Sequence, residues 1–417
     1  MMAKRTELAP NPSASIPVVT IQRRILQPLI YRKRIAQVRG AKPGDLVAVY
    51  TAENELVGYA LYNPRSEIAL RMLWHEPELP DDAAWDKTLS DAVHLRRNML
   101  ALDQDTNAYR VIHSESDCLS GIVVDKFNDV LSAEVFSLGM YQRAHLLLQR
   151  LAPLCDAKHL RVRCSPHFLS QEGCEPPEWT SEGCPSSVTV EEFGTRFRIR
   201  FEDAHKTGFF CDQRENRRRL ADFCRDKTVL DMCCYTGGFA VQAKKLGGAA
   251  DVTGVDLDET PLQLAKENAN LNQARVRFVQ ADAFPYMREM IRNGRQYDVV
   301  VLDPPKLIRS RAELEEGTRK HFALNRLAMR LVKPGGLMLS CTCAGLLSEA
   351  EFTQLLVSAA RQSGPEIDGP SDDESLVRYA PRTMRIIAKS GAASDHPVIS
   401  NCLETEYLNA VWMVFGD

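Results

Sequence analysis

Two cysteines late in the chain have the residue type and the position for nucleophilic catalysis. Cys341 and Cys343 follow a predicted strand, Leu337 to Cys341, in the run Ser340-Cys341-Thr342-Cys343-Ala344-Gly345. A thiolate beside a cofactor pocket can add to carbon 6 of a pyrimidine and make carbon 5 nucleophilic. The thiol needs a lowered pKa or a nearby base for this. A buried structural role is the alternative for this pair, and it is our interpretation of the other cysteines.

Acidic residues stand at the ends of four successive predicted strands. Asp231 ends the first strand, and Asp256 ends the second, 25 residues later. The carboxylate of Asp256 is placed to accept hydrogen bonds from both hydroxyls of a ribose. The third strand leads to Asp282, which could reach an adenine amino group, and the fourth ends in Asp303-Pro304-Pro305-Lys306.

The first strand runs into Cys233-Cys234-Tyr235-Thr236-Gly237-Gly238-Phe239, which lacks the Gly-x-Gly-x-x-Gly of dinucleotide-binding proteins. Taken alone, a Gly-Gly pair is usually a turn, and an acid after a strand is usually a helix cap. The four features in order predict an S-adenosyl-L-methionine site. The expected cofactor-binding residues are Tyr235, Thr236, Gly237, Asp256, Leu257, Asp282, Ala283 and Asp303. No metal is expected, because no Cys-x-x-Cys pairs occur.

Regular alternation of strands and helices after Asp212 would position these residues. Such alternation predicts an α/β fold with a doubly wound, mostly parallel sheet. The expected strands are Thr228 to Met232, Asp251 to Asp256, Val276 to Gln280, Tyr297 to Leu302, Leu337 to Cys341, Met384 to Ala388 and Tyr407 to Phe415.

The rest of the chain predicts two smaller regions in front of this domain. Residues 1–15 are expected to be a flexible leader. Residues 16–78 predict a small β-barrel with strands at Ile16 to Ile21, Leu46 to Thr51, Leu56 to Tyr62 and Ile68 to Trp74. Residues 83–201 predict a central α+β domain, with an exposed loop at Gln171 to Ser187 and a closing hairpin at Val188 to Phe201. Residues 202–417 form the α/β domain.

Charge and composition favour a reduced, cytoplasmic protein that meets RNA locally. The chain has 417 residues, a net charge of −3, no secretion signal and no apolar run that could span a membrane. Residues 1–42, however, contain nine basic groups against one acid. A solvated leader accounts for those in residues 1–15, whereas Arg23 to Lys42 is a candidate RNA contact.

Several motifs together resemble one known family, ribosomal RNA large subunit methyltransferase I, over roughly residues 17–417. The motifs are Glu115-Ser116-Asp117, Gly121-Ile122-Val123-Val124-Asp125, His205-Lys206-Thr207-Gly208-Phe209-Phe210, Asp212-Gln213-Arg214, Tyr235-Thr236-Gly237-Gly238-Phe239, Asp303-Pro304-Pro305-Lys306 and Asp395-His396-Pro397-Val398. The resemblance implies an N-terminal β-barrel PUA domain, a central α+β domain and a Rossmann-like class I methyltransferase domain. It also implies formation of 5-methylcytosine in 23S ribosomal RNA.

The same resemblance assigns roles to individual residues. Cys343 would be the nucleophile, Asp303 would hold the cytosine edge, and Gln213 with its neighbours would close over the cofactor. The substrate would be protein-free rRNA or an assembly intermediate, because the target base must be unstacked; a homodimer stays open. The chain departs from the family at Gln27-Pro28-Leu29, where the family often has His-Pro-Trp, and at His321-Phe322, where it often has Tyr-Lys.

Two other functions remain as alternatives. A related domain could methylate guanine at N7 or N2, which needs no thiol because the nitrogen attacks directly. A non-catalytic RNA-binding assembly factor could have kept the fold, although the acids Asp256 and Asp282 argue for a working cofactor site.

Overall fold

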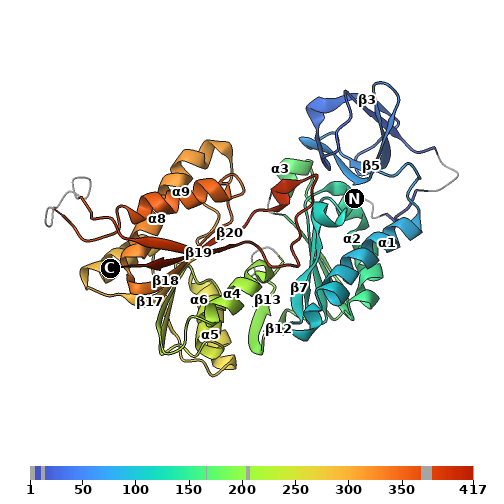
Figure 1. Cartoon of the computed structure of the whole chain (residues 1–417). Coiled ribbons are helices and arrows are strands. Elements are labelled where there is room, and N and C mark those ends of the chain that lie inside the picture. The colour runs from blue at the N-terminus through green and yellow to red at the C-terminus, as the bar shows by residue number, and fades with distance from the viewer. Residues whose placement is uncertain (1–4, 11–14, 166, 203–206, 368–377, 417) are drawn as a thin grey trace. The chain divides into compact units, whose positions relative to one another are not determined.

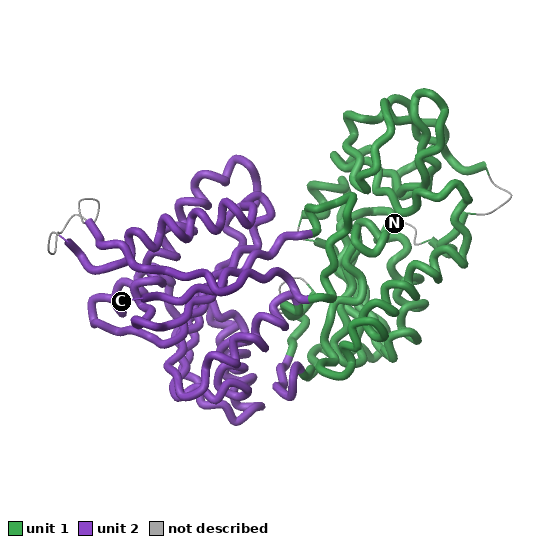
Figure 2. The backbone as a smooth tube through the Cα atoms, in the orientation of Figure 1, with its two compact units in different colours: residues 1–191, 199–211, 394–405 green, residues 192–198, 212–393, 406–417 purple. Residues whose placement is uncertain are grey.

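The chain folds into two compact units, neither of which is continuous in sequence. The computed structural model describes residues 5–10, 15–165, 167–202, 207–367 and 378–416. One unit contains residues up to 191 together with 199–211 and 394–405, and the other contains 192–198, 212–393 and 406–417 (Figure 2). The predicted division into a leader and three domains stays a prediction.

The first unit begins with a six-stranded sheet in the order β2-β6-β5-β4-β1-β3. Its apolar side chains, including Val19, Val47 and Leu70, form a separate core. Three of the predicted strands have the predicted bounds, and the first starts two residues later than expected. Two further strands, β2 and β3, were missed. The strands are β1 (Val18–Ile21), β2 (Leu29–Tyr31), β3 (Ile35–Arg39), β4 (Leu46–Thr51), β5 (Leu56–Tyr62) and β6 (Ile68–Trp74).

A second sheet in this unit has the order β11-β10-β9-β8-β7. Its strands are β7 (Ala108–His113), β8 (Ile122–Phe127), β9 (Val130–Val135), β10 (His159–Cys164) and β11 (Trp179–Thr180), with helices α1 (Asp82–His94), α2 (Leu138–Leu154) and α3 (Phe168–Glu172). The predicted loop at Gln171 to Ser187 is wrong in part, because α3 includes its first two residues, β11 lies in its middle and a further strand begins at Ser187. Phe168 is buried against the core, which explains why this stretch folds despite its polar composition.

Residues 5–10 belong to the predicted flexible leader, but in the structure they contact the first unit. Leu8 is buried in the core of the first unit, and Arg5 pairs with Asp45. The Arg5 backbone N–H also donates to Gln142 O at 3.0 Å. Residues 1–4 and 11–14 of the predicted leader lie outside the described residues.

The second unit is built on a seven-stranded sheet with the order β16-β15-β14-β17-β18-β20-β19. All neighbours are parallel except β20, which runs antiparallel to both β18 and β19. The predicted α/β class and mostly parallel sheet are therefore confirmed. The strands are β14 (Thr228–Met232), β15 (Asp251–Asp256), β16 (Arg277–Gln280), β17 (Tyr297–Leu302), β18 (Val332–Thr342), β19 (Met384–Ser390) and β20 (Asn409–Phe415); the hairpin β12 (Ser187–Glu192) and β13 (Thr195–Arg200) precedes them.

Helices cover both faces of this sheet (Figure 1). On one face α7 (Ala283–Arg292), α8 (Leu314–Arg330) and α9 (Glu349–Ala360) pack over Met232, Val300 and Met338. On the other, α4 (Arg214–Ala221) and α5 (Gly238–Lys245) pack over Val229, Val301 and Leu339, and α6 (Glu259–Leu271) lies beside α5. Side chains of a strand alternate between faces, so consecutive β18 residues meet different helices. None of the helices in the described part of the chain is both long and apolar enough for a membrane span.

Candidate active site

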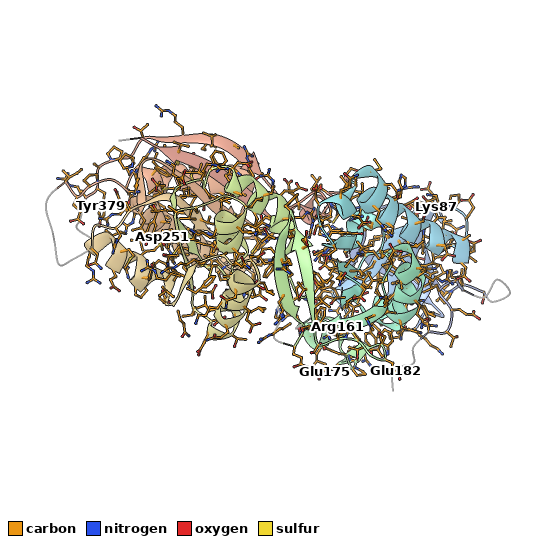
Figure 3. All side chains as sticks on the ribbon, turned by 90° about the horizontal axis from the view of Figure 1, so that it is seen from below. Lys87, Arg161, Glu175, Glu182, Asp251 and Tyr379 are labelled. Carbon is orange, nitrogen blue, oxygen red and sulfur yellow. The ribbon has the colours of Figure 1, made fainter. Side chains whose placement is uncertain are left out.

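The predicted functional residues of the second unit gather at the carboxyl edge of its sheet. Chain order reverses between β14 and β17, and ligands of open α/β sheets bind at such a switch point. Asp256, Asp282 and Asp303 each stand at or just after the end of β15, β16 and β17. Asp251, labelled in Figure 3, marks the opposite end of β15.

The turn after β14 has an unusual backbone. Cys233 and Tyr235 have positive φ angles of 61° and 49°, and Gly237 has a φ of 79°. A Cβ on Gly237 would also lie 3.1 Å from the side chains of both Ala265 and Phe278. Non-glycine residues in this region are strained, and such strain tends to persist at ligand sites. Thr236 is buried within the turn.

Asp256 holds this turn in place. Its Oδ2 accepts from the Tyr235 backbone N–H at 2.8 Å, and its Oδ1 accepts from the Asp258 N–H at 3.1 Å. Each carboxylate oxygen keeps a further lone pair, which suits a ribose diol. Leu257 beside it is 61% exposed, so an apolar surface is available to a flat base.

Asp282 is a helix cap in the structure, and its geometry leaves room for the predicted contact with adenine. It is the N-cap of α7, and its Oδ1 accepts from the Phe284 N–H at 2.8 Å. Ala283 is the first residue of that helix. The cap uses one carboxylate oxygen, so the other can accept from an adenine amino group.

Asp231 gives the site a buried carboxyl group. Its Oδ2 accepts from the Ala240 N–H at 2.9 Å, whereas its Oδ1 is buried without a hydrogen-bond partner among the described residues. Burial raises the pKa of Asp231 well above its ordinary value, and the charges of Asp303 and Asp256 raise it further. The cluster of carboxyl groups fits a ligand that carries positive charge on a sulfonium and an ammonium.

Gln213 and Asp303 are brought together at the end of β17. Gln213 Nε2 donates to Asp303 Oδ2 at 3.1 Å. Gln213 Oε1 in turn accepts from Asn216 Nδ2 at 2.7 Å, which fixes the amide orientation. The sequence motif containing Gln213 therefore reaches the same edge as the acids.

The two cysteines at the end of β18 differ in environment. Cys341 is fully buried, and burial raises the pKa of its thiol well above the ordinary value, with further increases from Asp303 and Cys343. Cys343, just past the strand end, is only partly buried. A neutral, enclosed thiol is a poor nucleophile, so Cys343 is the better placed of the two.

Other motifs of the resemblance lie in the first unit and form a buried polar network. Arg110 donates to both oxygens of Asp125, at 2.7 and 3.0 Å, and its backbone N–H donates to Asp395 at 2.7 Å. Thr207 also donates to Asp125. Three motif residues, Asp125, Thr207 and Asp395, therefore take part in buried hydrogen bonds within the first unit. His205 and Lys206 of the same motif lie outside the described residues.

The sequence did not reveal how α8 contacts the end of β18. The hydroxyl groups of Ser340 and Thr342 face α8. Ser340 Oγ donates to Asn325 Oδ1 at 2.6 Å, and Thr342 Oγ1 lies 3.2 Å from His321 Nε2. Among the described residues, no group of three or more His, Cys, Asp and Glu side chains has an arrangement that could hold a metal ion.

A seven-stranded sheet of this order, with these acids at its carboxyl edge, defines an S-adenosylmethionine-dependent methyltransferase. A family model described in those words matches residues 111–365, and a PUA-like domain model matches residues 23–74. A putative SAM-dependent methyltransferase from Streptococcus mutans has the same fold, with a TM-score of 0.75, 18% identity, and coverage of 95% of this chain and 99% of that one. A second solved structure, a putative methyltransferase complexed with SAH, has a TM-score of 0.74 with the same identity and coverage.

Sequence relatives are similar along almost the whole chain. Ribosomal RNA large subunit methyltransferase I of Alteromonas mediterranea is 32% identical over 390 residues, 92% of this chain and 94% of the relative. The protein of that name from Vibrio cholerae is 33% identical over 389 residues, 91% of this chain and 93% of the relative. The chain belongs to the ribosomal RNA large subunit methyltransferase I family, and its cofactor is S-adenosylmethionine.

Proposed function

We propose that this chain methylates carbon 5 of a cytosine in 23S ribosomal RNA, in the cytoplasm, through a covalent adduct on Cys343. The observation that carries the proposal is the partly buried Cys343 directly after β18, on the edge that also holds Asp303. The relatives that span the chain are named as large-subunit rRNA methyltransferases, which supports the substrate class.

The chemistry follows from the weak nucleophilicity of cytosine carbon 5. The Cys343 thiolate adds to carbon 6, and the electron pair of the ring double bond becomes available at carbon 5. S-adenosylmethionine supplies the electrophilic methyl group. Loss of the carbon 5 proton to a base then restores the double bond and expels the Cys343 thiolate.

Asp303 and Gln213 would orient the base for this reaction. The Asp303 carboxylate can accept from the cytosine amino group while Gln213 Nε2 holds its Oδ2 at 3.1 Å. Asp256 and Asp282 would bind the ribose and adenine of the cofactor, with Tyr235, Thr236, Gly237, Leu257 and Ala283 lining the site. Cytosine must leave its stack to reach these groups, so protein-free RNA or an assembly intermediate is the expected substrate.

A basic cluster in the PUA-like region supports RNA binding. Arg23 and Arg24 follow β1, and Lys33 and Arg34 lie in the 3-10 helix Arg32–Arg34. Gln22 joins the two segments: its Nε2 donates to the Lys33 carbonyl at 3.1 Å, and its backbone N–H donates to the Arg34 carbonyl at 3.0 Å. Within the described residues these four cations form no ion pair, and Arg23, Arg24 and Lys33 are exposed. Phosphate groups are the natural partner of such a surface.

A nucleophile test separates this proposal from its alternatives. Cys343→Ala should abolish methylation of 23S rRNA while S-adenosylmethionine binding, measured by calorimetry, is retained. Cys341→Ala is the matched control and should keep most of the activity. RNA transcribed with 5-fluorocytidine should form a persistent adduct with the wild-type protein, because fluorine cannot leave as a proton.

Each alternative has its own outcome. A fully active Cys343→Ala protein would remove the covalent mechanism. Methylguanosine instead of 5-methylcytidine in digested rRNA would establish guanine as the target. A wild-type protein that binds no S-adenosylmethionine would favour the non-catalytic assembly factor.

A further inference from the structure

A buried hydrogen-bonded pair supports the turn that carries Cys343. His321, on α8, is 1% exposed, and its Nε2 lies 3.2 Å from Thr342 Oγ1. Thr342 is the last residue of β18 and is fully buried. Its hydroxyl also accepts from the Ala344 backbone N–H at 3.3 Å. The hydroxyl therefore contacts the backbone on the far side of Cys343.

Strand geometry separates this pair from the thiols. Thr342 and Ser340 lie on the face of β18 that α8 covers, whereas Cys341 packs into the core on the opposite face. Cys343 also packs against that opposite core. The hydrogen bonds of the described residues connect His321 with the turn around Cys343 through Thr342.

Stability alone gives no reason for a histidine here. The Nδ1 atom of His321 is buried without a hydrogen-bond partner among the described residues. The imidazole ring also packs edge-on against the ring of Phe352, with the centroids 5.8 Å apart. Burial lowers the pKa of His321 to about 4, so the ring is neutral at pH 7. A buried polar atom left unpaired costs about 1–3 kcal/mol, a cost that an apolar residue would not have.

The chain has a second contact nearby that serves as an internal comparison. Ser340 Oγ donates to Asn325 Oδ1 at 2.6 Å, and Asn325 Nδ2 donates to the His321 carbonyl at 2.8 Å. This bond also joins β18 to α8, but it lies before the strand end and does not contact the turn. It supplies the same kind of buried hydrogen bond without the connection to Ala344.

We propose that His321 is a positioning residue, which holds the Thr342 hydroxyl against the turn and so fixes the orientation of the Cys343 thiol. The role in methyl transfer rests on the proposed function of Cys343. His321 itself contacts neither the base nor the cofactor in this proposal.

Paired variants test the hydrogen bond at both of its ends. His321→Leu and Thr342→Val remove it, whereas His321→Gln and Thr342→Ser retain a polar group that can restore it. We expect the removing variants to lower kcat at least about tenfold, equivalent to about 1.4 kcal/mol, with little change in KM for RNA. The restoring variants should recover most of kcat, and the double variant His321→Leu/Thr342→Val should be no slower than either single variant.

Two further measurements separate positioning from general loss of structure. Ser340→Ala should lower the melting temperature as much as Thr342→Val does, but leave kcat unchanged. The rate at which iodoacetamide alkylates Cys343, followed by peptide mass spectrometry, should change in His321→Leu and Thr342→Val and remain at the wild-type value in Ser340→Ala.

The outcomes distinguish this inference from the proposed function. Wild-type kcat and alkylation rate in both removing variants would overturn the positioning role, and so would an equal loss of kcat in Ser340→Ala. If Cys343→Ala proved fully active, the proposed function would fail, while the alkylation rates would still report whether His321 orients the thiol. If His321→Leu failed to fold, the Thr342→Val and Thr342→Ser pair would decide the matter.

Discussion

The carboxylate of Asp256 offers a direct test of the cofactor site, because its neighbour Asp258 provides a control of equal charge. Asp256 is expected to bind the ribose hydroxyls while it accepts the Tyr235 and Asp258 N–H groups at 2.8 and 3.1 Å. Asp256→Asn replaces one acceptor oxygen by a donor. An amide oxygen can keep one backbone hydrogen bond, but a charge-assisted bond to the cofactor is lost.

Such a bond contributes about 1.5–3 kcal/mol, so the Kd for S-adenosylmethionine should rise about 10- to 150-fold. Calorimetric titration without RNA measures this change directly. Asp258 is exposed, and its side chain makes no capping hydrogen bond to α6. Asp258→Asn should therefore change the Kd by no more than about twofold, since water and salt screen an exposed charge. An unchanged Kd in Asp256→Asn, or an equal increase in both variants, would refute the assignment of Asp256 to the ribose.

Two further predictions concern the stability of the second unit. Glu192 and Arg217 form an ion pair at 2.7 Å with side chains 0% and 3% exposed, so Glu192→Gln should lower the free energy of unfolding in urea by about 3–5 kcal/mol. Glu349→Gln, which breaks a largely exposed ion pair, should cost less than about 1 kcal/mol, and similar losses in the two variants would contradict the burial argument. Hydrogen bonds from Thr228 and Lys333 lower the pKa of Asp298 from 3.8 to about 2, despite an opposing effect of burial. The ionised carboxylate therefore stabilises the fold above about pH 4, and this stabilisation is lost as the pH falls toward 2. Asp298→Asn should lower the free energy of unfolding, measured in urea titrations, by about 1 kcal/mol at pH 7 and should not change it near pH 2. A difference that does not depend on pH would exclude this mechanism.

Buried strands of the second unit were predictable because both faces of the sheet are covered. β14, β15 and β17 have the bounds expected from their apolar runs, as strands buried on both faces do not alternate with polar residues. The acids at their ends followed from the same pattern. β18 begins earlier than predicted, since Lys333-Pro334-Gly335-Gly336 has the composition of a turn but continues the strand.

The short strands and the long-range contacts were not predictable in this way. β3 is almost wholly exposed, so its sequence Ile35–Arg39 shows no apolar period. Arg217 pairs with Glu192, at the end of β12, and Thr342 pairs with His321, on α8. Local patterns carry no information about which distant residues meet, so neither pairing could be predicted from the sequence.

The interleaved path of the chain limits how the protein can be divided. The backbone passes from one unit to the other five times, at 191/192, 198/199, 211/212, 393/394 and 405/406. A fragment starting at residue 202 would retain every proposed catalytic and cofactor residue but would lack Glu192, the buried ion-pair partner of Arg217. Excision at the apparent domain border should therefore yield an insoluble or partly unfolded product, and a viable minimal enzyme must include the β12–β13 hairpin.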